Sequence, residues 1–154
     1  MAKTKEMASS SDGKIERLKS VFQDQRDEWS KKSKKLSKQM KTSENLGSLQ
    51  GTLFAEIAII LDEKTSLVEG LITLNKSIRP KKKEALVNLK LNLELKMKTA
   101  GEQNVMIDAD LNNYLEREDL LGMQIQFLEA TLKNLNSMVW GIKNYIDLDK
   151  AGIS

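Results

Sequence analysis

LGMQIQFLEATLKNLNSMVWGIKNYI, residues 121–146, is the stretch that decides the fold. Its apolar residues recur at alternating intervals of four and three. Such spacing places them on one stripe of an α-helix, which can pack against another helix as in a coiled coil. We predict that this stripe mediates oligomerisation. Its members are Leu121, Ile125, Leu128, Leu132, Leu135, Val139, Ile142 and Ile146.

A second stripe with the same spacing lies upstream. It consists of Leu53, Ile57, Ile60, Lys64, Leu67, Leu71, Leu74 and Ile78. Lys64 is its charged member, and it either selects the register or oligomeric state of the helices or extends its amine to solvent. Two such stripes exceed what one slim monomer buries, so we expect helical hairpins that associate into a homo-oligomer. The predicted fold class is therefore all-α, with long amphipathic helices in a heptad pattern.

The segment after the second stripe contains the single proline of the chain. Arg79 and Pro80 are predicted to end the helix, because proline lacks an amide hydrogen and restricts the residue before it. Residues 89–98 alternate apolar and polar, which is a strand pattern, but their leucines, lysines and methionine favour a helix. A helix is preferred, with a short strand within 89–98 as the alternative. Residues 99–104 are expected to form a loop.

Residues 1–46 are basic, with a net charge of +5. Their lysine-rich run KKSKKLSKQ, residues 31–39, is expected to be too polar all round to pack on a core. We interpret 1–46 as a partly disordered N-terminal arm, which is either a solvated tail or an arm that binds an anionic ligand. Gly47 and Gly51 mark a break after it. The remainder, 47–154, is then a helical oligomerisation and DNA-binding domain.

The composition excludes several kinds of chemistry. The 154 residues include no cysteine and no histidine, so an imidazole base, a thiolate nucleophile and a zinc centre with these ligands are absent. No phosphate-binding glycine loop or nucleophile elbow occurs, and neither an enzyme nor a cofactor is expected. The acidic residues Glu116, Glu118 and Asp119 are interpreted as a solvated helix face rather than a metal site.

Hydropathy argues against a membrane protein. The longest uninterrupted apolar run, 57–61, is far shorter than the roughly 20 residues that a membrane helix needs. We therefore expect no membrane partner. The predicted location is cytoplasmic, since the absence of cysteine fits a reducing compartment.

Charge is segregated along the chain. Residues 76–98 carry a net charge of +6, whereas 99–154 carry −5. Several cations presented together are what phosphate binding requires, and lysine contacts phosphate without reading bases. We predict a nucleic-acid-binding site of little sequence preference, composed of Lys76, Arg79, Lys81, Lys82, Lys83, Lys90, Lys96 and Lys98. Trp140 and Tyr145 are expected to be core or interface aromatics rather than platforms on which bases stack.

Three parts of the chain resemble the UvsY family of phage recombination mediators. LNKSIRPKKKE (74–84) and LELKMK (93–98) are similar to the basic segment of that family, with Lys96 and Lys98 at the positions of its DNA-contacting cations. The third part is the ending, 114–152, where the matching residues are Asn136, Trp140, Ile142, Lys143, Asn144, Ile146, Asp147 and Gly152. The chain departs from the family at Thr99 and Ala100, where tyrosines are common, and at Met138, where an arginine is usual.

The resemblance implies a function and partners. A mediator of this kind is a ring-like homo-oligomer that binds single-stranded DNA, loosens single-strand-binding protein, and helps a RecA-like recombinase to load during recombination, repair and replication. The alternative from the heptads alone is a structural or adaptor coiled-coil protein whose lysines face solvent.

Overall fold

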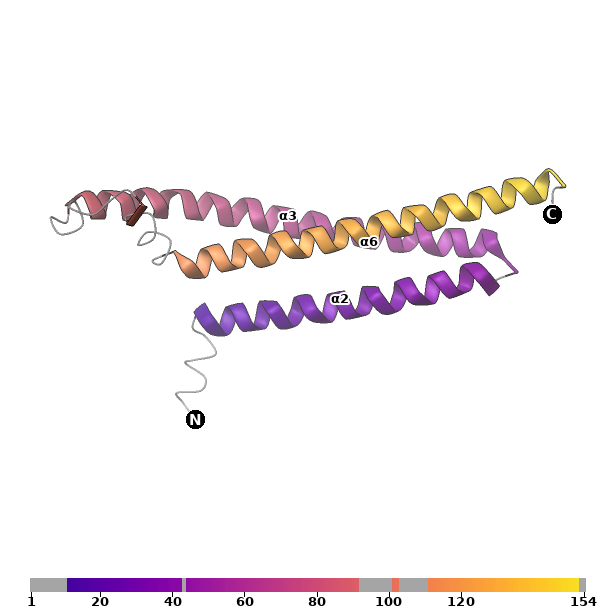
Figure 1. Cartoon of the computed structure of the whole chain (residues 1–154), viewed down its shortest axis with the longest axis horizontal. Helices are drawn as coiled ribbons and strands as arrows, with labels where there is room; N and C mark the ends of the chain where they lie inside the picture. Colours follow the sequence, from indigo (N-terminus) through magenta and orange to yellow (C-terminus); the bar gives the residue numbers. More distant parts are fainter. Residues whose placement is uncertain (1–10, 43, 92–100, 103–110, 153–154) are drawn as a thin grey trace, which may run out of the picture. The chain divides into compact units, whose positions relative to one another are not determined.

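A computed structural model of the chain describes residues 11–42, 44–91, 101–102 and 111–152. Most of these residues lie in three long helices, α2 (Ser11–Thr42), α3 (Leu46–Leu91) and α6 (Asn112–Lys150), drawn in Figure 1. The described ranges contain no strand, and the predicted all-α class is confirmed. Most of the ambiguous segment 89–98, and most of the predicted loop at 99–104, lie outside those ranges.

The chain divides into two compact units. The first unit comprises Met1–Lys19 and Val68–Met123, and the second comprises Ser20–Leu67 and Gln124–Ser154. Each of the three helices contributes a segment to both units. The two units are therefore described separately below.

In the second unit, α2 and α3 run in opposite directions. Trp29 of α2 meets Glu63 of α3, and Lys32, one turn later on α2, meets Glu56, two turns earlier on α3. The two helices are joined across residues 43–45. There the side-chain oxygen of Asn45 accepts a hydrogen bond from the Ser48 amide at 3.0 Å, which caps the start of α3.

The third helix of this unit, α6, runs parallel to α2. Gln124, the first residue of α6 in this unit, contacts Gln25 of α2. Gly141, further along α6, contacts Met40, further along α2. The helices approach closely at the second point, since a β-carbon on Gly141 would lie 3.1 Å from Met40 Cε. Figure 1 shows the resulting arrangement of three helices lying side by side.

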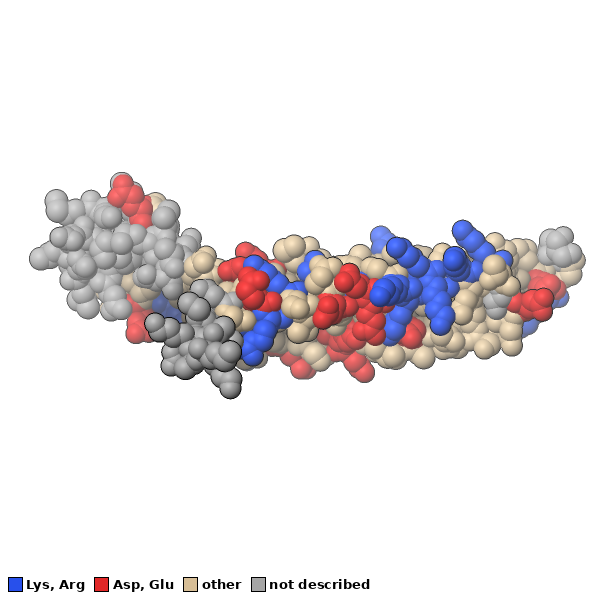
Figure 2. Space-filling view, turned by 90° about the horizontal axis from the view of Figure 1, so that it is seen from below, with Lys and Arg blue, Asp and Glu red and all other residues tan. Residues whose placement is uncertain are grey.

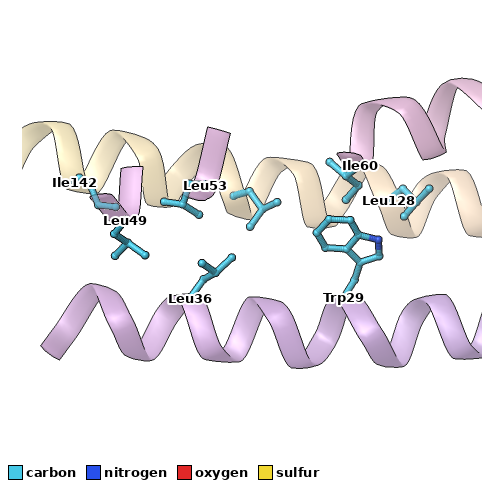
Figure 3. Close-up of a cluster of buried hydrophobic side chains, with 8 residues drawn as sticks. Trp29, Leu36, Leu49, Leu53, Ile60, Leu128 and Ile142 are labelled. Carbon is cyan, nitrogen blue, oxygen red and sulfur yellow. The ribbon is translucent and has the colours of Figure 1, made fainter. Parts of the chain in front are cut away.

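The core of the second unit contains apolar side chains from all three helices. Leu128, Leu135 and Ile142 of α6 follow one another at intervals of seven and have no exposed surface. Leu53 and Ile60 of α3 are equally buried. Figure 3 shows Trp29 and Leu36 of α2 completing this cluster.

The lysine-rich helix α2 is therefore part of the core, and the prediction that this segment is too polar to pack is wrong. Its buried residues occur every seventh position, at Ile15, Phe22, Trp29 and Leu36. One buried apolar side chain in two turns is fewer than the three or four apolar positions of a usual stripe, so the stripe is hard to recognise in the sequence.

Polar side chains fill the positions between these apolar ones. The indole nitrogen of Trp29 donates to Glu63 Oε2 at 2.7 Å, and Gln25 donates to the same oxygen at 3.1 Å. Gln124, which is 1% exposed, donates to Gln25 Oε1 and to the Phe22 carbonyl. Because each buried polar atom is paired, the burial of these groups costs little.

In the first unit, a smaller apolar cluster lies between α3 and α6. Leu111 is buried just before α6 begins, and it packs against Ala85, Tyr114 and Leu115. The Leu111 carbonyl accepts hydrogen bonds from the amides of Tyr114 and Leu115. Lys19 pairs with Glu116 at 3.2 Å and thereby connects α2 to α6 within this unit.

The helix α3 does not end at Pro80, so that prediction is wrong. It continues to Leu91, with proline inside it. Proline removes one backbone hydrogen bond, but good helix formers follow in 81–86, and the packing of Ala85 against Leu111 holds the next turns.

Every residue of the stripe predicted to mediate oligomerisation is buried or half-buried within the chain itself. Leu132, Val139 and Ile146 pack around the central cluster of the second unit. Lys64 is half-buried, and its amine lies 3.4 Å from Glu129 Oε1. The third helix, α2, thus supplies apolar cover that the two predicted stripes alone would lack, and oligomerisation stays a prediction.

We predict that Leu135→Ala destabilises the protein by about 2–5 kcal/mol, because it leaves a cavity at a fully buried position. Urea unfolding followed by circular dichroism measures the change. Leu148→Ala, at an exposed position on the same helix, is the matched control and is expected to change stability little. Equal effects of the two substitutions would contradict this core.

Candidate nucleic-acid interface

A group of cations lies in the part of α3 that belongs to the first unit. All its described side chains are exposed, and within the described residues none of them forms an ion pair. The group consists of Lys76, Arg79, Lys81, Lys82 and Lys83. Their only acidic neighbour before the end of the helix is Glu84.

Three of these cations share one face of α3. Lys76, Arg79 and Lys83 follow at intervals of three and four, which brings them onto one side of a helix. The buried Ile78 and the half-buried Ala85 lie on the opposite side. The core contacts of α3 therefore direct Lys76, Arg79 and Lys83 outward. We call these three residues the α3 basic face.

Lys81 has a different environment. Its amine lies 5.0 Å from the centre of the Tyr114 ring, and the Arg117 guanidinium lies 5.9 Å from the same centre. Both distances are within the range of a cation–π interaction. Periodicity and charge density do not reveal Tyr114 or Arg117 as site residues. These two residues approach Lys81 only when α6 folds back along α3.

The remaining predicted cations lie beyond the described side chains. Lys90 lies within α3, beyond the residues whose side chains are described, and Lys96 and Lys98 lie outside the described ranges. Five of the eight predicted nucleic-acid-binding residues therefore have described side chains. Three of these five share the α3 basic face, whereas Lys81 lies against Tyr114.

A second group of cations lies on α2 in the second unit. Between Glu28 and Glu44 the chain has six lysines and no acidic residue. Figure 2 shows basic side chains gathered over the C-terminal half of this helix. The five exposed members are Lys31, Lys34, Lys35, Lys38 and Lys41.

The sixth lysine, Lys32, is engaged by acidic side chains. Its amine lies 3.3 Å from Glu56 Oε2 of α3 and 3.3 Å from Glu28 Oε1 of its own helix. Partial burial lowers the pKa of Lys32, but the hydrogen bonds to Glu56 and Glu28 outweigh it, so the pKa lies above its ordinary value of 10.5. Lys32 therefore joins α2 to α3 rather than presenting its charge to a ligand.

Two aromatic side chains project from α6 in the second unit. Trp140 is 63% exposed and Tyr145 is 59% exposed, so the prediction that they lie in a core is wrong. The other half of that prediction, an interface role, stays a prediction. Lys143 lies 5.0 Å from the Trp140 ring centre.

Two further features of the described residues concern metal binding and membrane spanning. No cluster of three or more acidic side chains there is arranged to hold a metal ion. Glu116, one of the three acidic residues considered above, is engaged by Lys19. None of the described helices combines the length and apolar character that crossing a membrane requires.

Comparison with known proteins adds no relative. No protein-family model, no curated protein and no solved structure matches this chain.

We predict that Lys32→Met lowers the unfolding temperature near neutral pH. The difference in unfolding temperature between this variant and the native protein should disappear above pH 10.5. A raised lysine pKa contributes stability that is fully present below the pKa of the unfolded chain and is lost as the pH rises through the folded value. Thermal unfolding followed by circular dichroism across alkaline pH measures this difference.

The control for this series is Lys31→Met, which removes an exposed neighbouring lysine. It has no stabilising ion pair to lose, so its unfolding temperature should not fall below that of the native protein near neutral pH. If the difference in unfolding temperature between Lys32→Met and the native protein widens above pH 10.5, the stabilising pairing of Lys32 with Glu56 and Glu28 is contradicted.

Proposed function

We propose that this protein is a non-enzymatic recombination mediator that binds single-stranded DNA through the α3 basic face. The observation that carries the proposal is that Lys76, Arg79 and Lys83 are exposed together on one side of α3. Cations held in this way neutralise neighbouring phosphates and release counterions, which is the main source of affinity for nucleic acid. Lys82 adds positive charge beside them.

The preference for a single strand over a duplex comes from the resemblance to the UvsY family. Tyr114, the ring that contacts Lys81, belongs to the cluster around Leu111 and Ala85, on the side of α3 opposite the α3 basic face. It is therefore not placed to stack a base beside these three cations. Contacts to phosphate carry no sequence information directly, so the α3 basic face fits a ligand of unspecified sequence.

The mediator role comes from the resemblance to the UvsY family. In that role, a ring-like homo-oligomer loosens single-strand-binding protein and helps a RecA-like recombinase to load. The basic segment 74–84 that carries part of the resemblance is also the segment with the most concentrated exposed charge in α3. The resemblance to the UvsY family and the exposed positive charge therefore concern the same residues.

The alternative is a structural or adaptor protein without nucleic-acid binding. The exposed apolar side chains of the second unit favour it, since Phe54 and Trp140 are more than half exposed. Exposed apolar groups of this size are found at protein–protein contacts. A recombinase or a second subunit would also use such contacts, so DNA binding is the property that separates the two functions.

We predict that replacing the α3 basic face with glutamine, as Lys76→Gln, Arg79→Gln and Lys83→Gln, weakens binding to oligo(dT). Fluorescence anisotropy across a salt series gives the slope of log affinity against log salt. That slope should become shallower by about 2, since each phosphate contact on a single strand contributes about 0.7.

The matched control removes three charges from α6, as Lys133→Gln, Lys143→Gln and Lys150→Gln. It should leave the slope nearly unchanged, although the net charge falls equally. If both triple variants change the slope alike, binding depends on net charge and the α3 basic face is not the site. No binding by the native protein even at low salt would favour the adaptor.

The mediator role needs a separate measurement. On single-stranded DNA already covered by single-strand-binding protein, the native protein should shorten the lag before a RecA-like recombinase begins to hydrolyse ATP. The α3 triple variant should not shorten it. DNA binding without any effect on the lag would leave a DNA-binding protein that is not a mediator.

A further inference from the structure

The outer face of α2 presents a row of lysines in the second unit. Lys31, Lys34, Lys38 and Lys41 follow at intervals of three, four and three, so they share one side of the helix. Leu36, which is buried, lies on the opposite side. Among the described residues, none of these four lysines takes part in an ion pair.

The row has a defined length and a fixed backbone. From Lys31 to Lys41 the helix rises by about 15 Å, at 1.5 Å per residue. Trp29 and Leu36 anchor this part of α2 in the core, and the pairing of Lys32 with Glu56 connects it to α3. The backbone that carries these lysines is therefore ordered before any ligand arrives, so binding does not have to order the helix itself.

These lysines also repel one another. Like charges three or four positions apart on a helix are unfavourable, and the nearest acidic residues along the chain are Glu28 and Glu44. A polyanion lying along the row would relieve that repulsion while it contacts several amines at once. A neutral or basic partner would not.

An exposed aromatic ring stands at the C-terminal end of the row. Tyr145 of α6 borders a hollow of about 520 Å³ together with Ser37, Met40, Lys41 and Leu46. Lys41 thus belongs both to the row and to the surroundings of this ring. The Tyr145 side chain is 59% exposed, so the ring is accessible from solvent.

We propose that this surface, comprising Lys31, Lys34, Lys38, Lys41 and Tyr145, is a second binding site for single-stranded nucleic acid. The lysines contact successive phosphates, and one unstacked base lies on Tyr145. A positively charged track that ends at an aromatic ring is the arrangement by which single strands are bound without sequence preference. A duplex keeps its bases stacked and would use the lysines alone.

The second site is independent of the one proposed on α3. It lies on α2 and α6 in the second unit, whereas the α3 basic face lies in the first unit. Its lysines fall in 1–46, outside the part of the chain that resembles the UvsY family. Either site can therefore be wrong without affecting the other.

The first experiment is lysine footprinting on the native full-length chain. An amine-reactive label is applied with and without saturating oligo(dT) or oligo(U), and the labelling rates are read by mass spectrometry. Lys34, Lys38 and Lys41 should be protected several-fold by either oligonucleotide. Lys133, an exposed lysine on the α3 side of α6, is the internal control and should be labelled equally in both states.

The second experiment separates the ring from the charges. Tyr145→Ala should weaken oligo(dT) binding about tenfold, in the range that one base–aromatic stack contributes, and it should leave binding to inorganic polyphosphate unchanged. Tyr145→Phe should restore oligo(dT) affinity. These measurements are made in the native chain and in the α3 triple variant, so that binding at the α3 basic face does not hide the result.

Two results would overturn the proposal. One is equal labelling of Lys34, Lys38 and Lys41 with and without oligonucleotide in a chain that binds it. The other is protection of these lysines by polyphosphate or an acidic peptide but by neither oligonucleotide, which would assign the row to a different class of anion. Circular dichroism of the Tyr145→Ala protein verifies that its helices are intact.

Discussion

The rest of the structure depends on the contact between three apolar stripes in the second unit. Leu128, Leu135 and Ile142 of α6 are fully enclosed by residues of α3 and α2. Burial of one such side chain contributes about 1.5–3 kcal/mol, whereas an isolated helix is marginal in water. The dependence is greatest for α2, because its lysines repel one another, and its C-terminal half is held in the cluster by the buried Trp29 and Leu36 and the partly buried Met40. The lysines of α2 form an ordered surface because Trp29 and Leu36 are buried in the core.

Polar contacts within the bundle fix how the helices align. Gln124 contacts α2 at both Gln25 and the Phe22 carbonyl, and Glu63 of α3 accepts from Gln25 and Trp29. A shift of one helix along another would leave these buried groups without partners, at a cost of about 1–3 kcal/mol each. Apolar stripes with a repeat of seven tolerate such shifts far better. The alignment in turn sets which lysines of α2 lie near Tyr145 of α6.

Much of α3 and α6 could be predicted because their apolar residues recur at regular intervals, with Lys64 as the charged exception in α3, so helical periodicity alone reveals them. The packing of α2 could not, since the positions between its buried residues hold Gln25 and Lys32, whose partners lie on other helices. The helix through Pro80 was missed because local restrictions on proline were weighed without the contact that Ala85 makes with Leu111. The lysines of α3 could be identified as a group from charge density. Their division between an outward face and the Tyr114 contact depends on which side of α3 is buried. The exposure of Trp140 depends in the same way on which side of α6 is buried.

The most direct test of this account is the environment of Trp29, because its burial shows that α2 packs into the chain. The protein has two tryptophans, so Trp140→Phe leaves Trp29 as the sole reporter. Its fluorescence should be blue-shifted and resistant to acrylamide in native buffer, since this side chain is 1% exposed, and both properties should be lost in denaturant. Emission and quenching like those of free tryptophan, in a protein whose far-ultraviolet circular dichroism is still helical, would contradict the packing of α2 into the core.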